Sequence, residues 1–192
     1  MLKLERTPGM HRTYAFNQQD DHPIDLNSGL HQAFELLKNN DLNQAENMLQ
    51  MLIVQYPKES EPRLLLGSTY YRQGRYMQAE QTFQQLLLYH PESAAGYNNL
   101  CETLIKLQRF DEAQRAILAA VKLAPDNTSI LLTAANLHAL RREDAAAINF
   151  LQRALSQGEK VENILRYREL MQLLERPEFQ KYYQQMSNQP AK

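Results

Sequence analysis

The sequence predicts an all-α fold in which antiparallel helix pairs stack in series as an α-solenoid. Three prolines, Pro57, Pro91 and Pro125, are each 34 residues apart, and each follows a leucine-rich amphipathic segment. Between them, apolar residues recur at spacings of three and four, which places them on one face of a helix. With only 6 Gly and 8 Pro among 192 residues, the chain has too few turn residues for an all-β protein.

The repeat period aligns small and large apolar residues in separate columns. Small residues allow the two helices of a window to approach closely, and the larger residues fill the grooves between them. The small columns are Ala33, Gly67, Cys101 and Ala135, and Ala45, Ala79, Ala113 and Ala147. The larger columns include Leu49, Phe83, Ile117 and Leu151, and also Leu36, Tyr70, Leu104 and His138.

Each of four windows is expected to form two helices joined by a tight polar turn, on the segments NND, QGR, LQR and RRE. Ser60, Ser93 and Asn127 stand where an N-cap side chain is needed at the start of the following window. The prolines end one helix before the next begins. The windows are 26–59, 60–93, 94–127 and 128–159.

The two ends of the chain do not follow the repeat. Residues 1–25 are polar and aperiodic, which predicts a mobile N-terminal arm. An alternative is that this arm lies in the chain's own groove through Tyr14 and Phe16. Residues 188–192 are expected to be a disordered tail.

Residues 160–187 are expected to form two capping helices, because a repeat stack needs a terminal cap with a polar outer face. In the first, 161–175, helical spacing returns at Ile164, Tyr167, Leu170, Met171 and Leu174.

The second capping helix begins with Pro177, a residue that suits the first turn of a helix. Its apolar residues Phe179, Tyr182 and Met186 are expected to pack within the cap rather than to bind a partner.

These windows resemble tetratricopeptide repeats. In the second window the residues at the family's motif positions are Leu66, Gly67, Tyr70, Ala79, Phe83, Leu86 and Pro91. The fourth window departs from the motif at Asp144 and Glu159, and the chain has no Trp. The resemblance covers about residues 26–159, and it implies a right-handed superhelical solenoid that binds other proteins.

The resemblance also implies a concave groove lined mainly by the first helix of each pair. Lys38, Arg72 and Lys106 recur at the repeat period as a basic row, and Asn99 and Asn136 are amides that can pair with the main chain of a peptide. A partner with acidic side chains and some apolar anchors would fit this groove; the alternative is that the row is ordinary solvated surface. The candidate groove residues are Phe34, Lys38, Leu65, Ser68, Arg72, Asn98, Asn99, Glu102, Lys106, Thr133 and Asn136.

One known use of such repeats is not supported. Some members of the family clamp a chaperone's terminal carboxylate with two Lys, two Asn and an Arg at fixed positions in three successive repeats. Here those positions match at most once in either possible register. In the first register they hold Leu30, Phe34, Leu65, Ala95 and Asn99.

The sequence does not predict an enzyme, a metal site or a cofactor. Cys101 falls in a small-residue column, and His138 falls in a column otherwise held by Leu and Tyr, so both are expected to be structural. None of the common catalytic or nucleotide-binding motifs occurs. Asp20, Asp21 and His22 can touch a metal, but they lie in the expected arm with no second cluster nearby.

Composition restricts the partner and the compartment. A net charge of −1 excludes a nucleic-acid binder that works through bulk positive charge. No segment approaches the roughly 18–20 apolar residues of a membrane span. The lack of a signal-peptide pattern and the single cysteine predict a cytoplasmic location.

The sequence therefore predicts a non-enzymatic adaptor or scaffold that binds a peptide segment or partner protein in its concave groove. The alternative is a dedicated bacterial secretion chaperone or a pilus or envelope assembly factor, since small bacterial proteins with this repeat serve such systems. A homo-oligomeric structural subunit is a further possibility, and the oligomeric state is left open.

Overall fold

The computed structural model describes residues 24–187, apart from the side chains of residues 161, 182, 183 and 185–187, and all its regular elements are α-helices. The first eight form four consecutive hairpins. The hairpins are α1 (Leu26–Lys38) with α2 (Leu42–Gln55), α3 (Ser60–Arg72) with α4 (Tyr76–Tyr89), α5 (Ala94–Lys106) with α6 (Phe110–Leu123), and α7 (Thr128–Leu140) with α8 (Asp144–Ser156). The predicted all-α solenoid is confirmed.

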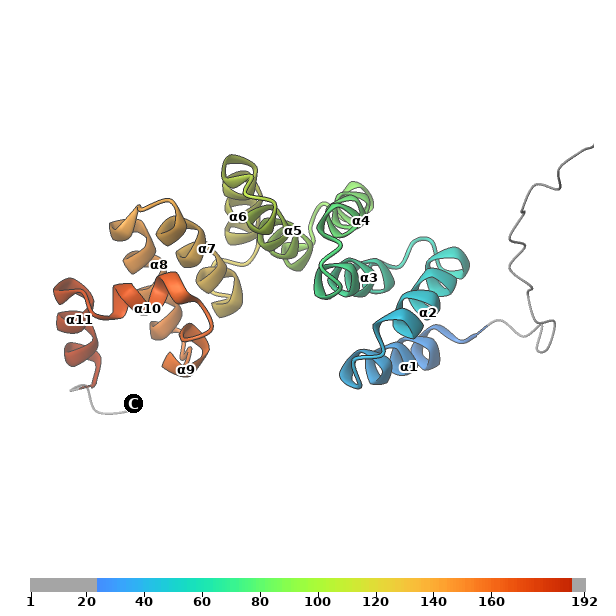
Figure 1. Cartoon of the computed structure of the whole chain (residues 1–192), viewed down its shortest axis with the longest axis horizontal. Coiled ribbons are helices and arrows are strands. Elements are labelled where there is room, and N and C mark those ends of the chain that lie inside the picture. The colour runs from blue at the N-terminus through green and yellow to red at the C-terminus, as the bar shows by residue number, and fades with distance from the viewer. Residues whose placement is uncertain (1–23, 188–192) are drawn as a thin grey trace, which may run out of the picture.

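The hairpins follow one another along an arch (Figure 1). From α1 to α8 consecutive helices pack against each other, and α5 also contacts both α3 and α7. The first helices of the pairs line the hollow side of the arch, and the second helices lie outside (Figure 1). This arrangement is a right-handed α-solenoid with an inner, concave face.

The turns inside the hairpins repeat with the same period as the sequence. Each contains one residue with a left-handed backbone, where the preceding helix ends and the chain reverses. These residues are Asn40 (φ 64°), Gly74 (φ 74°), Gln108 (φ 60°) and Arg142 (φ 62°). The following residue then donates its N–H to the carbonyl five positions back, as from Asp41 to Leu36 at 2.8 Å.

Two of the three predicted helix caps are confirmed. The side chains of Ser93 and Asn127 accept hydrogen bonds from the backbone N–H three residues on, each at 3.1 Å. The prediction for Ser60 is wrong, because Ser60 is the first residue of α3 and Glu59 precedes it as the N-cap, without a side-chain bond. The residue three positions after Glu59 is Pro62, which has no N–H to donate to a capping side chain.

The aligned columns form the core between the helices of each pair. Ala33, Ala45, Ala79 and Ala113 have no exposed surface, and Phe83 is 1% exposed. A Cβ atom added to Gly67 would meet the Phe83 ring, so this position admits only glycine while the phenylalanine fills the crossing.

Three short helices close the C-terminal end: α9 (Val161–Ile164), α10 (Arg168–Leu174) and α11 (Pro177–Ser187). α10 packs on α7 and α8, and α11 contacts α10. Phe179 is 2% exposed and belongs to this core, as predicted, whereas the side chains of Tyr182 and Met186 are outside those that the structure describes.

The expectation of one helix over 161–175 is wrong, because the chain is interrupted between α9 and α10. Ile164 and Leu170 are both fully buried. Residues six apart on one continuous helix point about 120° apart, so a break is needed to bury both against the fourth hairpin. Tyr167 stands at the break with an extended backbone.

The start of the described chain is fixed to the first hairpin. The Tyr56 hydroxyl donates to the carbonyl of Ile24 at 2.8 Å, and Asp25 caps α1. These two residues were expected to belong to the arm. The rest of the expected arm, with Tyr14, Phe16 and Asp20 to His22, and the expected tail lie outside the described residues.

Candidate functional site

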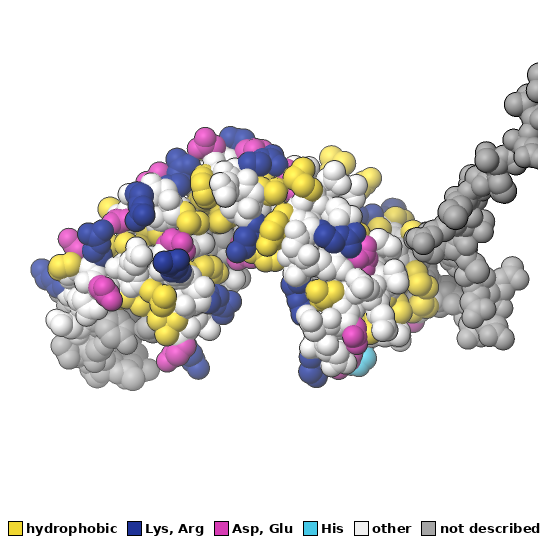
Figure 2. Space-filling model, viewed as in Figure 1, with side chains coloured by type: hydrophobic (Ala, Val, Ile, Leu, Met, Phe, Trp, Pro, Cys, Tyr) yellow, Lys and Arg dark blue, Asp and Glu magenta, His cyan; other side chains and the backbone are white. Residues whose placement is uncertain are grey.

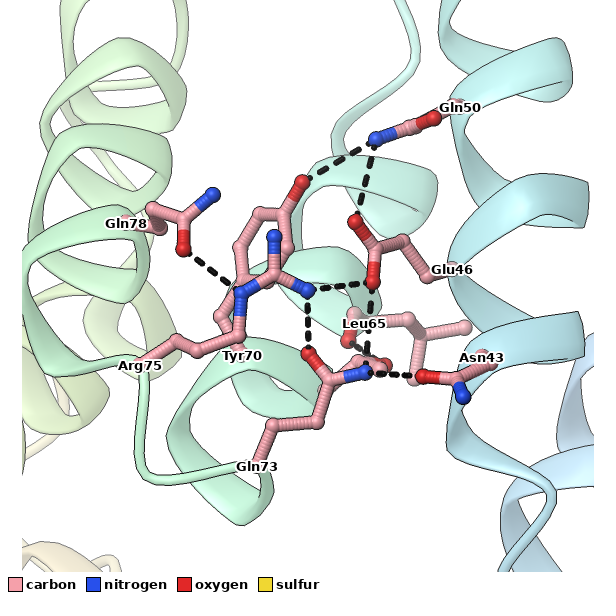
Figure 3. A network of polar contacts seen from close by, with 9 residues as sticks. Asn43, Glu46, Gln50, Leu65, Tyr70, Gln73, Arg75 and Gln78 are labelled. Atoms are coloured by element: carbon pink, nitrogen blue, oxygen red, sulfur yellow. Dashed lines mark hydrogen bonds and ion pairs between the residues drawn. The ribbon is translucent and has the colours of Figure 1, made fainter.

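Ion pairs link neighbouring hairpins along the arch. At the first junction, Arg75 Nη1 lies 2.5 Å from Glu46 Oε2, and Gln73 donates to the same oxygen at 3.2 Å (Figure 3). The Arg75 guanidinium also lies 4.4 Å from the centre of the Tyr70 ring. Burial would raise the pKa of Glu46, but the hydrogen bonds from Arg75 and Gln73 outweigh it and hold the pKa below its ordinary value.

The same Arg–Glu ion pair recurs 34 residues later, at the second junction, but not at the third. Arg109 Nη1 lies 2.6 Å from Glu80 Oε2, and the Glu80 side chain is 6% exposed. At the third junction the equivalent positions hold Glu143 and Gln114. The Gln114 side-chain oxygen is buried without a hydrogen-bond partner in the described part of the chain, and Glu143 pairs with His138 and Arg141 instead.

The predicted groove residues differ widely in exposure. Phe34, Lys38, Arg72 and Lys106 are exposed, the three cations each in the last turn of an inner helix. Lys38 lies 3.6 Å from Glu35, and Arg72 donates to Asn40 at 3.1 Å. The half-buried residues are Leu65, Ser68, Asn99 and Glu102, and the buried ones are Asn98, Thr133 and Asn136.

The structure brings some of these residues together across neighbouring inner helices. Asn99 Nδ2 donates to Ser68 Oγ at 3.3 Å, between α5 and α3. Thr133 Oγ1 donates to Glu102 Oε1 at 3.1 Å, between α7 and α5. Because Thr133 is only 1% exposed, its hydroxyl orients the Glu102 carboxylate instead of presenting itself on the surface.

The C-terminal half of the concave face contains a hollow of about 680 Å³. The molecule is recessed along this side, and Lys and Arg side chains project around the recess (Figure 2). Its volume lies within the range of about 300–1,000 Å³ that is usual for ligand sites. Three predicted residues line the hollow, namely Glu102, Lys106 and Asn136.

Several residues of this hollow were missed by the sequence analysis. Tyr71 and Ile105 lie next to the basic row and are themselves 34 residues apart, so the repeat period contained a signal for them. Arg166 and Tyr167 come from the break between α9 and α10. No repeat position corresponds to them, so their place could be known only once the cap was docked on the fourth hairpin.

Glu102 lines this hollow together with a second acidic residue, Glu169. Burial raises the pKa of the Glu102 carboxyl above the ordinary value, although the Thr133 hydrogen bond and the charges of Arg166 and Lys106 act in the opposite direction. Burial and the Glu102 charge also raise the pKa of Tyr71 and of Tyr167. The hollow therefore combines a desolvated carboxyl with two tyrosines that stay protonated.

The Glu102→Gln variant should change how stability depends on pH. Since the pKa of Glu102 is higher in the folded than in the unfolded chain, its stabilising contribution is complete below about pH 4.5 and is lost as pH rises through the folded value. We expect Glu102→Gln to gain stability relative to the wild type in urea unfolding as pH rises above about 4.5. Glu46→Gln removes a carboxyl whose pKa is lowered by folding, so this variant should lose stability relative to the wild type as pH rises. A stability difference for Glu102→Gln that does not change with pH would contradict the raised pKa of Glu102.

Cys101 and His138, the two residues considered for catalysis, lie in surroundings that are typical of a structural role. Burial raises the pKa of the Cys101 thiol, which disfavours the nucleophilic thiolate. His138 Nδ1 lies 2.6 Å from Glu143, and its ring stacks on Phe150 at 5.3 Å. Within residues 24–187, no group of three or more His, Cys, Asp or Glu side chains could hold a metal ion.

Comparison with protein families finds tetratricopeptide repeat models along most of the described chain. One model matches residues 36–98 and again 72–122, and a second matches residues 102–161. No curated protein matches the chain. In residues 24–187, no helix is both long and apolar enough to cross a membrane.

Solved structures with the same fold include three examples of low sequence identity. A thermophilic TPR protein of Thermus thermophilus has a TM-score of 0.69 at 20% identity, over 78% of this chain and 81% of that one. PilF of Pseudomonas aeruginosa has a TM-score of 0.71 at 16% identity, over 87% and 77%. A MamA protein has a TM-score of 0.66 at 18% identity, over 83% and 88%. At these identities the likeness concerns the fold alone.

Proposed function

Because this chain belongs to the tetratricopeptide repeat family, whose repeats form scaffolds for protein–protein interaction, we propose that it is a non-enzymatic adaptor that binds an extended segment of a partner protein along its concave face. The observation that supports this proposal is the hollow beneath the inner helices, where a half-buried carboxyl, two tyrosines and a buried amide converge. Such a concentration of polar groups is typical of a site that fixes the orientation of a ligand.

The mechanism in this proposal is preorganisation. Ion pairs at the first two junctions and the fully buried columns hold the inner helices in place before a ligand arrives. The ordering cost of binding then falls mainly on the segment, which favours a transient complex of ordinary interface size. The exposed basic row supports a partner with acidic side chains, and the exposed Phe34 supports an apolar anchor.

Reversal of the basic row tests this proposal. The triple variant Lys38→Glu, Arg72→Glu and Lys106→Glu should keep its helicity and should weaken the complex with an acidic partner by about tenfold or more. The partner is obtained by co-purification from the native cell, identified by mass spectrometry, and titrated calorimetrically.

The matched control reverses three exposed cations away from the inner helices, at Lys58, Arg115 and Lys122. It changes net charge equally, so loss of affinity only in the basic-row variant supports the concave face. Equal loss in both variants would show that general charge attraction governs the complex, and no loss would show that the row is solvated surface.

The second candidate is a dedicated secretion chaperone or a pilus or envelope assembly factor. The exposed apolar side chain of Phe34 on an inner helix favours it, because a chaperone must hold an apolar client segment. The same co-purification separates the two functions. One apolar client in equal amount supports the chaperone, whereas weaker capture of acidic segments supports the adaptor.

A further inference from the structure

The carboxylate of Glu102 lacks a cationic partner. In the part of the chain that the structure describes, no Lys, Arg or His nitrogen lies within 4.0 Å of it. Arg166, the cation of the cap that faces it, donates instead to the main-chain and side-chain oxygens of Asn163, at 3.1 and 3.3 Å. A desolvated carboxylate held by one hydroxyl is unfavourable unless a cation joins it.

A second polar group in the same hollow is also unsatisfied. Asn136 is 9% exposed and lines the hollow, yet its side-chain oxygen has no hydrogen-bond partner among the described residues. Buried amides are nearly always hydrogen-bonded in folded proteins. The Glu102 carboxylate therefore lacks a counter-charge within the described chain, and the buried oxygen of Asn136 adds a second unsatisfied acceptor to the lining of the hollow.

Aromatic rings complete the surroundings of these acceptors. Tyr71 and Tyr167 line the hollow from opposite elements, α3 and the α9–α10 break. Aromatic faces attract ammonium and guanidinium groups, and they pack well against the aliphatic stem of a long basic side chain. A carboxylate, an amide oxygen and two aromatic rings together form a cation-binding environment.

We propose that this hollow takes one basic side chain of the bound segment, a Lys or Arg whose cation pairs with Glu102 while its stem lies against Tyr71 and Tyr167. This inference rests on the proposed function and refines its ligand. The exposed cations around the hollow, Lys106, Arg166 and Arg168, then suit acidic residues on either side of that basic residue.

Removal of the Lys106 charge should affect cation binding in the opposite direction to removal of the Glu102 charge. Lys106 lies one helical turn from Glu102 on α5, and its charge acts on the Glu102 carboxyl from beyond ion-pair distance. In the free protein it partly offsets the unpaired carboxylate and so competes with a ligand cation. Removal of its charge should therefore strengthen the binding of a cation, whereas the same removal weakens an acidic segment.

The test uses small probes on the full chain, so that no partner needs to be known. n-Butylguanidinium and n-butylammonium are titrated against butyramide, a neutral molecule of similar length, while NMR follows the Asn136 side-chain amide. We expect the cations to bind about tenfold more tightly than the neutral probe. Glu102→Gln should abolish this preference, and Lys106→Met should increase it.

The controls separate this inference from folding and from the proposed function. Gln at position 102 can still accept the Thr133 hydrogen bond, and circular dichroism checks the fold. Glu92→Gln removes an equal charge at an exposed remote position and should leave the preference unchanged. Equal binding of cationic and neutral probes, absence of binding, or a preference that survives Glu102→Gln would each overturn the inference, whatever the basic-row variant does to a protein partner.

Discussion

Phe83→Ala should lower the free energy of unfolding by about 3–5 kcal/mol, the usual cost of removing a fully buried aromatic side chain. Phe83 is 1% exposed and is the largest of the fully buried side chains in the described part of the chain. It fills the crossing of α3 and α4 above Gly67, so its loss leaves a cavity that rigid helices cannot close. Urea unfolding followed by circular dichroism measures the effect.

Gly67 supplies the internal control for this prediction. Gly67→Ala alone should cost about 1–3 kcal/mol, because the new methyl group would meet the Phe83 ring. In the Phe83→Ala background that clash is absent, so the same substitution should cost nothing further. Additive effects of the two substitutions would show that the pair is not in contact.

Leu170→Ala should destabilise the C-terminal part of the fold by about 2–5 kcal/mol. Leu170 has no exposed surface and shares one core with Leu131 and Leu151 of the fourth hairpin. The cap therefore completes a core that the fourth hairpin cannot bury alone. Chemical unfolding measures the loss.

The neighbouring methionine is the matched control for the cap. Met171 is 41% exposed, so Met171→Ala should change the free energy of unfolding by no more than about 0.5 kcal/mol. Similar effects at the two positions would contradict the docking of α10 on α7 and α8.

Features that depend on local sequence and recur in every repeat could be predicted. The hairpin turns follow from polar segments between two helical faces, and the columns of alanine follow from close helix approach, as at Ala79 and Ala113. Each position of the motif occurs in four repeats, so the fourth hairpin could be predicted although its own motif is atypical.

Features that depend on tertiary docking could not be predicted. The break at Tyr167 arises because Ile164 and Leu170 must both be buried against a surface that the sequence alone does not position. The helix α3 begins at Ser60 with Glu59 as its N-cap, one residue before the position that the sequence indicated. The link from Glu46 to Arg75 spans neighbouring repeats, and its electrostatic role became clear only with the side chains in place.

The candidate site was predicted in part for the same reason. Periodicity indicated the inner helices, and so brought Glu102, Lys106 and Asn136 into one set. It did not distinguish a buried Thr133 from an exposed Arg72, since that difference depends on how closely the neighbouring elements pack around each side chain. The cap residues Arg166 and Tyr167 lie outside the period altogether.

Site-specific photo-cross-linking tests the central claim, that the inner wall of the arch is the binding face, most directly. A benzophenone amino acid is placed in the native cell either at Phe34, 46% exposed on the inner helix α1, or at Leu118, 53% exposed on the outer helix α6. We expect a cross-link to one partner protein from Phe34 and none to that partner from Leu118. A partner captured from Leu118 but not from Phe34 would contradict this claim.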